Sequence, residues 1–144
     1  MRALLDINVC IALLDPNHVF HEGAHSWRSV NQKHGWASCP LTENGIVRIM
    51  SNPAYSKETR FPITCLILRL RMFVSQTNHE FWPDDLSLRS AEIFDPERLH
   101  SSGRLTDRYL LALAADRKGR LATFDQAISI SVVKNAKPQN LISI

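Results

Sequence analysis

The sequence predicts an α/β fold in which a single domain, residues 1–144, is built around a central parallel β-sheet. The first observation is segment 3–14, which is apolar except where Asp6 and Asn8 interrupt it. Such a break is typical of a buried strand that turns tightly into a short helix. The second is that short apolar segments alternate with longer helical patterns, which predicts a sheet covered by helices on both faces. The third is the length of 144 residues, enough for one domain with a core and too short for two.

Composition and charge agree with a globular domain. Hydrophobic residues make up 44% and charged residues 22% of the chain, which is ordinary for such proteins. The net charge of +3 and pI near 9.0 suit a polyanionic partner without establishing one. Cys10, Cys39 and Cys65 are odd in number and widely spaced, as expected for reduced thiols. With no signal peptide pattern and no apolar run near the roughly 18 residues that span a bilayer, we expect a cytoplasmic protein.

The first half of the chain shows two helices around a short strand. Segment 18–35 predicts a helix, because Phe20, Ala24 and Trp27 recur at helical spacing on what should be its buried face and Gly35 supplies a stop. Residues 36–38 predict a strand, after which Pro40 is a good first-turn residue for the next helix.

The middle of the chain continues the alternation. The helix that begins at Pro40 is expected to end near 51–53, and the polar segment 54–61 predicts a loop. A helix is expected over 63–74 and a second short strand over 79–82. We also expect a helix over 84–95, with an aspartate as its cap.

The last third is expected to contain a loop, a helix and two strands. Residues 96–104 predict the loop, and Thr106 is a natural N-cap for a helix closed by Lys118-Gly119. Residues 120–123 and 140–144 predict strands. Leu110, Leu111 and Leu113 give the helix apolar atoms on more than one face, which suits either a two-sided core or a dimer interface.

Four acidic residues are predicted to meet at one edge of the sheet. Asp6 and Asp125 each follow a predicted strand, and Glu43 and Asp107 each lie in the first turn of a predicted helix. Strand ends and the helix starts that follow them share one edge of a parallel sheet. Asp107 needs a separate assumption, because a loop precedes it. Singly, each acid has a structural explanation as a helix-dipole or turn residue, so the pattern carries the argument.

A cluster of carboxylates predicts a divalent metal site. Like charges a few ångströms apart raise one another's pKa values, and hard oxygen ligands are what Mg²⁺ or Mn²⁺ prefers. Two such ions about 4 Å apart can hold the attacking water and the leaving oxygen of a phosphodiester. Asn8 and Thr123 are expected to orient Asp6 and Asp125 by hydrogen bonds.

Segments 4–15, 39–53, 105–114 and 119–125 together resemble the PIN-domain ribonucleases, specifically the VapC-type toxins of bacterial toxin–antitoxin pairs. The resemblance covers nearly the whole chain. It implies a Rossmann-like α/β/α sandwich and Mg²⁺-dependent cleavage of RNA, with Mn²⁺ able to substitute. It further implies a homodimer and a VapB-type antitoxin that wraps the toxin and blocks its cleft, in a heterotetramer or larger assembly.

The same resemblance assigns the catalytic, metal-binding quartet and shows one departure. Asp6, Glu43, Asp107 and Asp125 match the family's four acids. The family usually has Thr or Ser after the first aspartate, whereas this chain has Ile7. A hydroxyl that could bond the carboxylates is therefore missing, which would reduce metal affinity or activity.

Two further patterns bear on function. Arg48, Arg104 and Arg108 are candidates for contacts to RNA phosphates, with a solvated surface as the plain alternative. The run His21–His25 spells H-E-x-x-H, the zinc motif of metalloproteases. No third ligand follows it at a known spacing, so we do not expect a zinc site there.

Two other functions are compatible with acids at a sheet edge. A catalytically inactive PIN scaffold that only binds a partner is one, and Ile7 is the observation in its favour. A Mg²⁺-dependent phospho-acceptor signalling domain is the other. Such domains have paired acids after the first strand and a lysine after a late one, whereas here Asp6 stands alone and Asp125 occupies the later position.

Overall fold

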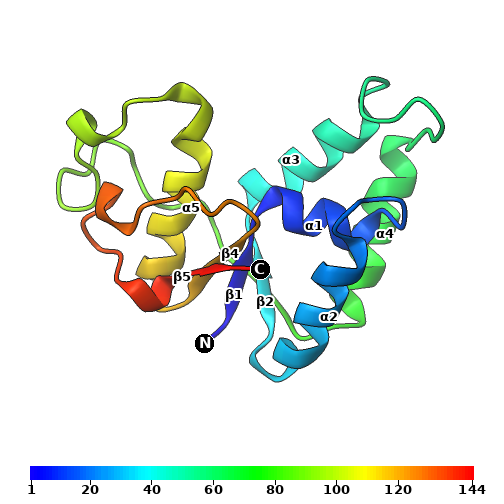
Figure 1. Ribbon diagram of the computed structural model, residues 1–144, viewed down its shortest axis with the longest axis horizontal. Helices are drawn as coiled ribbons and strands as arrows, with labels where there is room; N and C mark the ends of the chain where they lie inside the picture. Colours follow the sequence, from blue (N-terminus) through cyan, green and yellow to red (C-terminus); the bar gives the residue numbers. More distant parts are fainter.

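The computed structural model describes residues 1–144 and contains one five-stranded sheet in the order β3-β2-β1-β4-β5. All four pairings between neighbouring strands are parallel, as the sequence predicted. β1 lies at the centre, so the chain crosses outward to β3 on one side and to β5 on the other (Figure 1). The strands are β1 (Ala3–Leu5), β2 (Trp36–Ser38), β3 (His79–Phe81), β4 (Arg120–Thr123) and β5 (Leu141–Ser143).

Helices cover both faces of this sheet. Four helices pack on one face and α5 packs on the other (Figure 1). Short 3-10 turns at 32–34, 96–98, 102–104, 130–132 and 138–140 lie between the main elements. The helices are α1 (Ile7–Leu14), α2 (His21–Asn31), α3 (Pro40–Ser51), α4 (Ile63–Ser75) and α5 (Leu105–Asp116).

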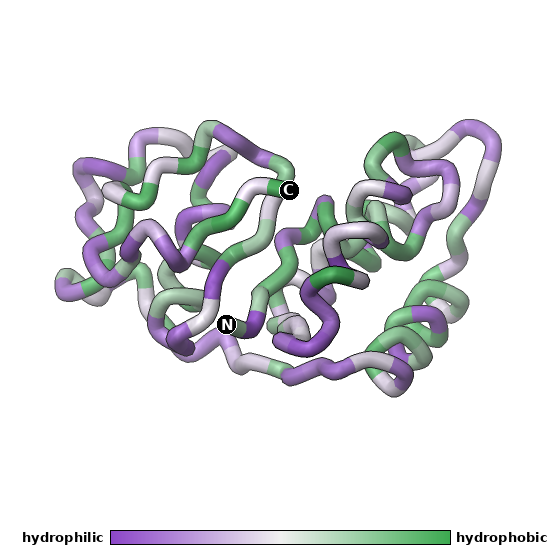
Figure 2. The backbone as a smooth tube through the Cα atoms, turned by 60° about the horizontal axis from the view of Figure 1, so that its bottom comes forward, coloured by the Kyte–Doolittle hydropathy of each residue, from purple (hydrophilic) through white to green (hydrophobic).

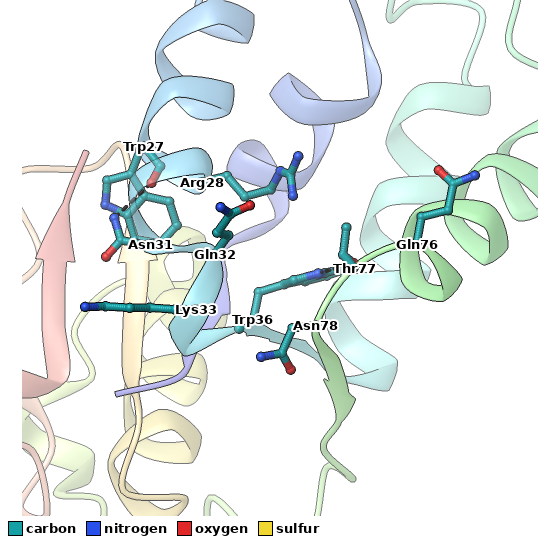
Figure 3. Close-up of a pocket in the computed structure, with 10 residues that line it drawn as sticks. Trp27, Arg28, Asn31, Gln32, Lys33, Trp36, Gln76, Thr77 and Asn78 are labelled. Carbon is teal, nitrogen blue, oxygen red and sulfur yellow. Dashed lines mark hydrogen bonds between the residues drawn. The ribbon is translucent and has the colours of Figure 1, made fainter.

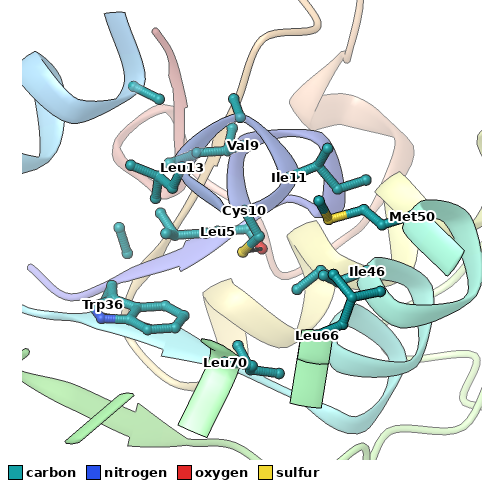
Figure 4. Close-up of a cluster of buried hydrophobic side chains, with 14 of the residues drawn as sticks. Leu5, Val9, Cys10, Ile11, Leu13, Trp36, Ile46, Met50, Leu66 and Leu70 are labelled. Carbon is teal, nitrogen blue, oxygen red and sulfur yellow. Dashed lines mark hydrogen bonds between the residues drawn. The ribbon is translucent and has the colours of Figure 1, made fainter. Parts of the chain in front are cut away.

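The central strand supplies both halves of the core. Successive side chains of a strand point to opposite faces, so Leu5 joins the cluster under α1 to α4 while Leu4 joins the cluster under α5. Figure 4 shows the first cluster, in which Cys10 and Met50 fill space between the helices and the sheet. Hydrophobic residues follow the strands through the middle of the molecule, and hydrophilic residues occupy the outer turns (Figure 2).

The helix expected over 84–95 is wrong, because this segment is irregular. Local and tertiary hydrogen bonds replace helical ones: the Asp84 carboxylate accepts from the Leu41 amide at 2.8 Å, and the Ser87 hydroxyl accepts from a backbone amide two residues on. Polar side chains that bond to backbone groups in this way compete with a helix. The buried rings of Trp82 and Phe94 fix the ends of the segment against α5.

Two helix starts also differ from expectation. Thr106 is not an N-cap, because the 3-10 turn 102–104 runs directly into α5, which begins at Leu105. The α-helix expected from residue 18 begins only at His21, which leaves Phe20 at the N-cap with 50% of its surface exposed rather than on the buried face.

The end of α5 follows the prediction. Lys118 adopts a positive φ of 56°, and the Gly119 amide donates to the Ala114 carbonyl at 2.8 Å, which closes the helix. Residues 110–114 are all buried. A two-sided core within the single chain therefore accounts for the apolar residues of α5.

Two glycine substitutions test this packing in opposite directions. A Cβ atom at Gly119 would lie 2.7 Å from the Trp82 ring and 2.8 Å from the Arg2 carbonyl, whereas one at Gly23 in α2 meets nothing within 4 Å. We expect Gly119→Ala to lower the free energy of unfolding by about 1–3 kcal/mol through overpacking. Gly23→Ala should raise it by about 0.5–1 kcal/mol through helix propensity. Urea unfolding of both variants measures the difference, and equal effects would contradict the packing described.

Candidate active site

Asp6 is the best-fixed acid at the carboxyl edge of the sheet. It follows β1 and caps α1, where one carboxylate oxygen accepts from the Ile7 amide at 2.6 Å. The other oxygen accepts from the Thr123 hydroxyl at 2.8 Å. Only 5% of the residue is exposed. Burial raises the pKa of this carboxyl, and the two hydrogen bonds oppose that shift.

Asp107 and Asp125 interact electrostatically with Asp6. Burial raises the pKa of Asp107 to about 6, and the negative charges of Asp6 and Asp125 add to that shift. Thr123 links the other two acids, because its hydroxyl oxygen accepts from the Asp125 amide at 3.0 Å while donating to Asp6. One oxygen of Asp125 also accepts from the Ala127 amide at 2.7 Å. Three of the four predicted acids therefore interact across β1, β4 and the start of α5.

The Glu43 carboxylate forms its hydrogen bond with Ser38 of β2 rather than with the residues around Asp6. It lies in the first turn of α3, and its carboxylate accepts from the Ser38 hydroxyl at 2.6 Å. The Ser38 hydroxyl oxygen is also 2.8 Å from a ring nitrogen of His79. Because Ser38 donates its one proton to Glu43, the His79 nitrogen must be the donor in this chain of bonds. Ser38 and His79 could not be identified from the sequence, because they stand in neighbouring strands β2 and β3 and become close only through strand pairing.

The four acids have the right donor atoms for a divalent cation, but their carboxylates do not converge on one position in this structure. All supply hard oxygen donors of the kind Mg²⁺ or Mn²⁺ binds. Burial first, and then the charges of Asp6 and Asp125, raise the pKa of Asp107 and outweigh the opposite effect of Arg104 and Arg108. No three His, Cys, Asp or Glu side chains lie close enough together in this arrangement to hold one ion, and Glu43 is turned toward Ser38.

The other supporting residues differ in position. Asn8 is exposed on α1 and makes no hydrogen bond to Asp6. Ile7, which stands where the resemblance expects a hydroxyl, packs against α3: a Cβ atom at Gly45 would lie 2.5 Å from its side chain. Ile7 and Gly45 thus complement each other in shape.

Two of the three candidate arginines border the acids. Arg104 and Arg108 share with Asp107 a small cavity of about 80 Å³, and the buried Nη1 atom of Arg108 has no hydrogen-bond partner in it. Both guanidinium charges lower the pKa of Asp107. Arg48 lies exposed in the last turn of α3, farther along the helix than Glu43.

The H-E-x-x-H histidines have a structural role. His21 donates from a ring nitrogen to the Ala12 carbonyl at 2.7 Å, and His25 to the Leu13 carbonyl at 3.0 Å. These are among the last carbonyls of α1, which lack partners within their own helix. The pair therefore ties α2 to α1.

A larger cavity lies away from the acids. It has a volume of about 390 Å³ and lies beside Gly35 and Asn78, which precede β2 and β3 (Figure 3). This is the amino edge of the parallel sheet, opposite the edge where the acids lie. In Figure 3 the side chains of Arg28 and Lys33, which both line this cavity, extend in opposite directions. Because this cavity lies at the opposite edge of the sheet from the acids, we do not assign it to the active site.

Comparisons with known proteins identify the class of this fold. No family model matches the chain. The VapBC2 complex of Rickettsia felis, solved with a DNA fragment from its promoter, has the same fold: the TM-score is 0.56 at 13% identity, over 100% of this chain and 99% of the other. The central parallel sheet between helical layers is that of a PIN domain.

Sequence relatives give the family. Ribonuclease VapC44 of Mycobacterium tuberculosis is 43% identical over 144 residues, which is 100% of both chains. Ribonuclease VapC39 of the same organism is 44% identical over 131 residues, 91% of this chain and 94% of the relative. Ribonuclease VapC38 is 33% identical over 99% of each. The chain belongs to the VapC family of PIN-domain toxins. None of its helices is long and apolar enough to cross a membrane.

The charge on Asp107 should destabilise the protein when no metal is present. Its folded-state pKa of about 6 exceeds the ordinary value of 3.8. The stability that protonation contributes is therefore complete below about pH 4 and lost as the pH rises through 6. Allowing for partial exposure, we expect Asp107→Asn in EDTA to be more stable than wild type by about 1 kcal/mol at pH 7.5 and nearly equal at about pH 3.5.

Urea unfolding at the two pH values measures this difference. Asp116→Asn, an exposed acid at the end of the same helix, is the control and should leave stability unchanged at both. An Asp107→Asn variant no more stable than wild type at pH 7.5 would show that burial and the neighbouring acids do not disfavour the charged form of Asp107.

Proposed function

We propose that this protein is a metal-dependent endoribonuclease and the toxin of a type II toxin–antitoxin pair. The observation that carries the proposal is the link of Asp6 to Asp125 through Thr123 at the carboxyl edge of the sheet, with Asp107 and Glu43 in the first turns of α5 and α3. Relatives along the full chain are named ribonucleases, which supports RNA as the substrate. RNA as substrate in turn supports action in the cytoplasm.

The four carboxylates are proposed to hold Mg²⁺, or Mn²⁺ in its place. When bound, the cation neutralises charge on the scissile phosphate and activates water for attack. The chain's own residues fix the geometry: Thr123 and the Ile7 amide hold both oxygens of Asp6, so this ligand cannot rotate. Arg104 and Arg108 are proposed to bind the phosphates that flank the cleaved bond, with Arg48 at the edge of the same surface.

A VapB-type antitoxin is the proposed partner. α4 carries an exposed apolar row, whose members are 44–54% exposed. Exposed aliphatic residues grouped on one helix are typical of a protein–protein contact. The related R. felis structure is a VapBC complex. We propose that the antitoxin or the second protomer of a homodimer covers this row, in a heterotetramer or larger assembly: Ile63, Ile67, Leu68 and Met72.

Cleavage of RNA by the purified protein tests the enzyme proposal. We expect cleavage with Mg²⁺ or Mn²⁺, none in EDTA, and a loss of roughly 100-fold or more in Asp6→Asn and Asp107→Asn. Asp116→Asn should cleave at the wild-type rate. Sequencing of RNA ends after brief expression identifies the sites in cells. Intact RNA at high enzyme concentration with Mn²⁺, together with normal growth on expression, would contradict the proposal.

The inactive-scaffold alternative makes a different prediction for metal binding. It has two observations in its favour, the aliphatic Ile7 beside Asp6 and the engagement of Glu43 by Ser38. A scaffold without a metal site should bind no Mn²⁺ in titration calorimetry, whereas the enzyme should bind it with an affinity that falls in Asp6→Asn.

Ser38 is proposed to position Glu43. Loss of its hydroxyl removes the hydrogen bond to Glu43 and also separates His79 from it. We expect Ser38→Ala to weaken Mn²⁺ affinity by about 10–100-fold, the usual effect of losing a partner of a metal ligand. Excess Mn²⁺ should restore cleavage to this variant but not to Asp6→Asn. Ser75→Ala, which removes an exposed hydroxyl in α4, is the control, and equal Mn²⁺ affinities for the two serine variants would refute this role.

A further inference from the structure

Three aromatic rings stand together beside the acids. His18 and Phe20 lie in the loop between α1 and α2, and Phe124 follows β4. The ring centroids of Phe20 and Phe124 are 4.7 Å apart, and those of His18 and Phe124 are 6.4 Å apart. The His18 and Phe20 centroids are separated by 5.9 Å. These residues, called the aromatic platform below, thus form one continuous aromatic surface.

The platform borders the active site through the chain itself. Phe124 stands between Thr123, which donates to Asp6, and Asp125, whose amide donates to Thr123. Its ring packs on the α1 side of the sheet, where Phe20 meets it. A group lying on these rings would therefore be next to whatever the acids hold.

Phe20 departs from two local rules at this point. It is the N-cap residue of α2, a position that favours short polar side chains, and it makes no side-chain cap. Half of its surface is exposed, although burial of a phenylalanine ordinarily contributes about 1.5–3 kcal/mol. Residues that break local rules in an otherwise consistent sequence tend to serve function.

His18 is held in a defined orientation over the platform. Its Nδ1 atom accepts from the Phe20 amide at 3.0 Å, and its ring lies within 20° of the plane of Phe124. In the neutral imidazole the accepting nitrogen carries no proton, so Nε2 carries it. No hydrogen-bond partner occupies that nitrogen. The platform therefore combines ring faces inclined to one another by 20–42° with one donor at its edge.

We propose that the aromatic platform stacks an unpaired base of the RNA strand adjacent to the phosphate at the acids. Proteins that hold single-stranded nucleic acid combine aromatic rings, on which bases stack, with groups that bind the backbone. The inference rests on the proposed ribonuclease function and adds to it a preference for single-stranded over paired RNA. The His18 Nε2–H supplies a hydrogen bond to the base edge or its sugar.

The chemistry of the surface favours a base over a protein segment. The exposed row on α4 is aliphatic, as protein contacts commonly are, whereas the platform consists of aromatic rings. The Phe20 and Phe124 centroids, 4.7 Å apart with ring planes inclined by 34°, lie within the range of distances at which aromatic rings pack. The direct sequence link of Phe124 to Asp125 also puts the platform near the proposed site of cleavage.

The test measures binding without cleavage. A short single-stranded RNA that carries the fluorescent base 2-aminopurine is titrated with the full-length protein in Ca²⁺ in place of Mg²⁺. Stacking quenches the fluorescence of this base. We expect Phe20→Ala and Phe20→Leu each to weaken binding roughly 10-fold, the loss expected for one stacked base, and Phe20→Tyr or Phe20→Trp to retain it. In cleavage with Mg²⁺, KM should rise in Phe20→Ala while kcat stays near wild type.

Matched controls separate stacking from other roles. Val19→Ala removes a neighbouring apolar side chain that is 84% exposed and should bind like wild type. Duplex RNA should bind wild type and Phe20→Ala equally, because its bases are not available. Wild-type affinity for single-stranded RNA in Phe20→Leu would overturn the proposal. So would a Phe20→Ala variant that loses antitoxin binding and keeps RNA binding.

Failure of this proposal and failure of the ribonuclease proposal are distinguishable. If wild type cleaves RNA and substitution of Phe20 changes neither binding nor KM, the platform is refuted and the enzyme stands. If wild type binds single-stranded RNA through Phe20 and never cleaves it, the platform stands and the enzyme is refuted. Thermal unfolding of each variant verifies that it is folded.

Discussion

The buried carboxylate of Asp6 is the constraint on which the rest of the structure depends. A charged group with 5% exposure is unfavourable unless hydrogen bonds replace its water. Here the first amide of α1 and the hydroxyl of Thr123 at the end of β4 do so. The same two bonds fix how the chain turns from β1 into α1 and how β1 lies against β4. The core of the sheet and the candidate active site are therefore stabilised by common interactions.

The acids at this edge of the sheet lower the stability of the fold, although the proposed function requires them. Asp107 and Asp125 add negative charge next to a carboxylate that is already short of solvent. The compensation comes from the apolar clusters on the two faces of the sheet, which meet at Leu4 and Leu5 one residue before the acid. A cation bound at this edge would offset the unfavourable free energy of these buried negative charges.

The elements that could be predicted from sequence are those with a local signal. β1, β4 and β5 follow from short apolar runs, the start of α3 from Pro40, and the end of α5 from Lys118-Gly119. Asp6 and Asp125 could be placed together because parallel strands bring their ends to one edge. Spacing alone did not place Asp107 at this edge, because a loop precedes it. The resemblance to VapC toxins provided that assignment.

The features that could not be predicted depend on contacts between distant segments. Residues 84–95 carry enough helical pattern to mislead, but Asp84 bonds to α3 and Asp85 forms an ion pair with Arg117. Phe20 has the spacing of a buried residue and is exposed, because the helix begins one residue later. The link from His79 through Ser38 to Glu43 requires the pairing of β2 with β3, and nothing in either segment indicates it.

The difference between Glu43 and the other acids has a physical reason. Both oxygens of Asp6 are fixed by hydrogen bonds, and Asp125 is held at both its amide and its carboxylate. Glu43 has a longer side chain and one hydrogen bond to a hydroxyl, an interaction to a charged group that contributes about 1.5–3 kcal/mol. Divalent charge held by three carboxylates would attract a fourth more strongly than a neutral hydroxyl does. The fixed acids would therefore define the position of a cation. Ser38 and His79 define the position of the Glu43 carboxylate when no cation is bound.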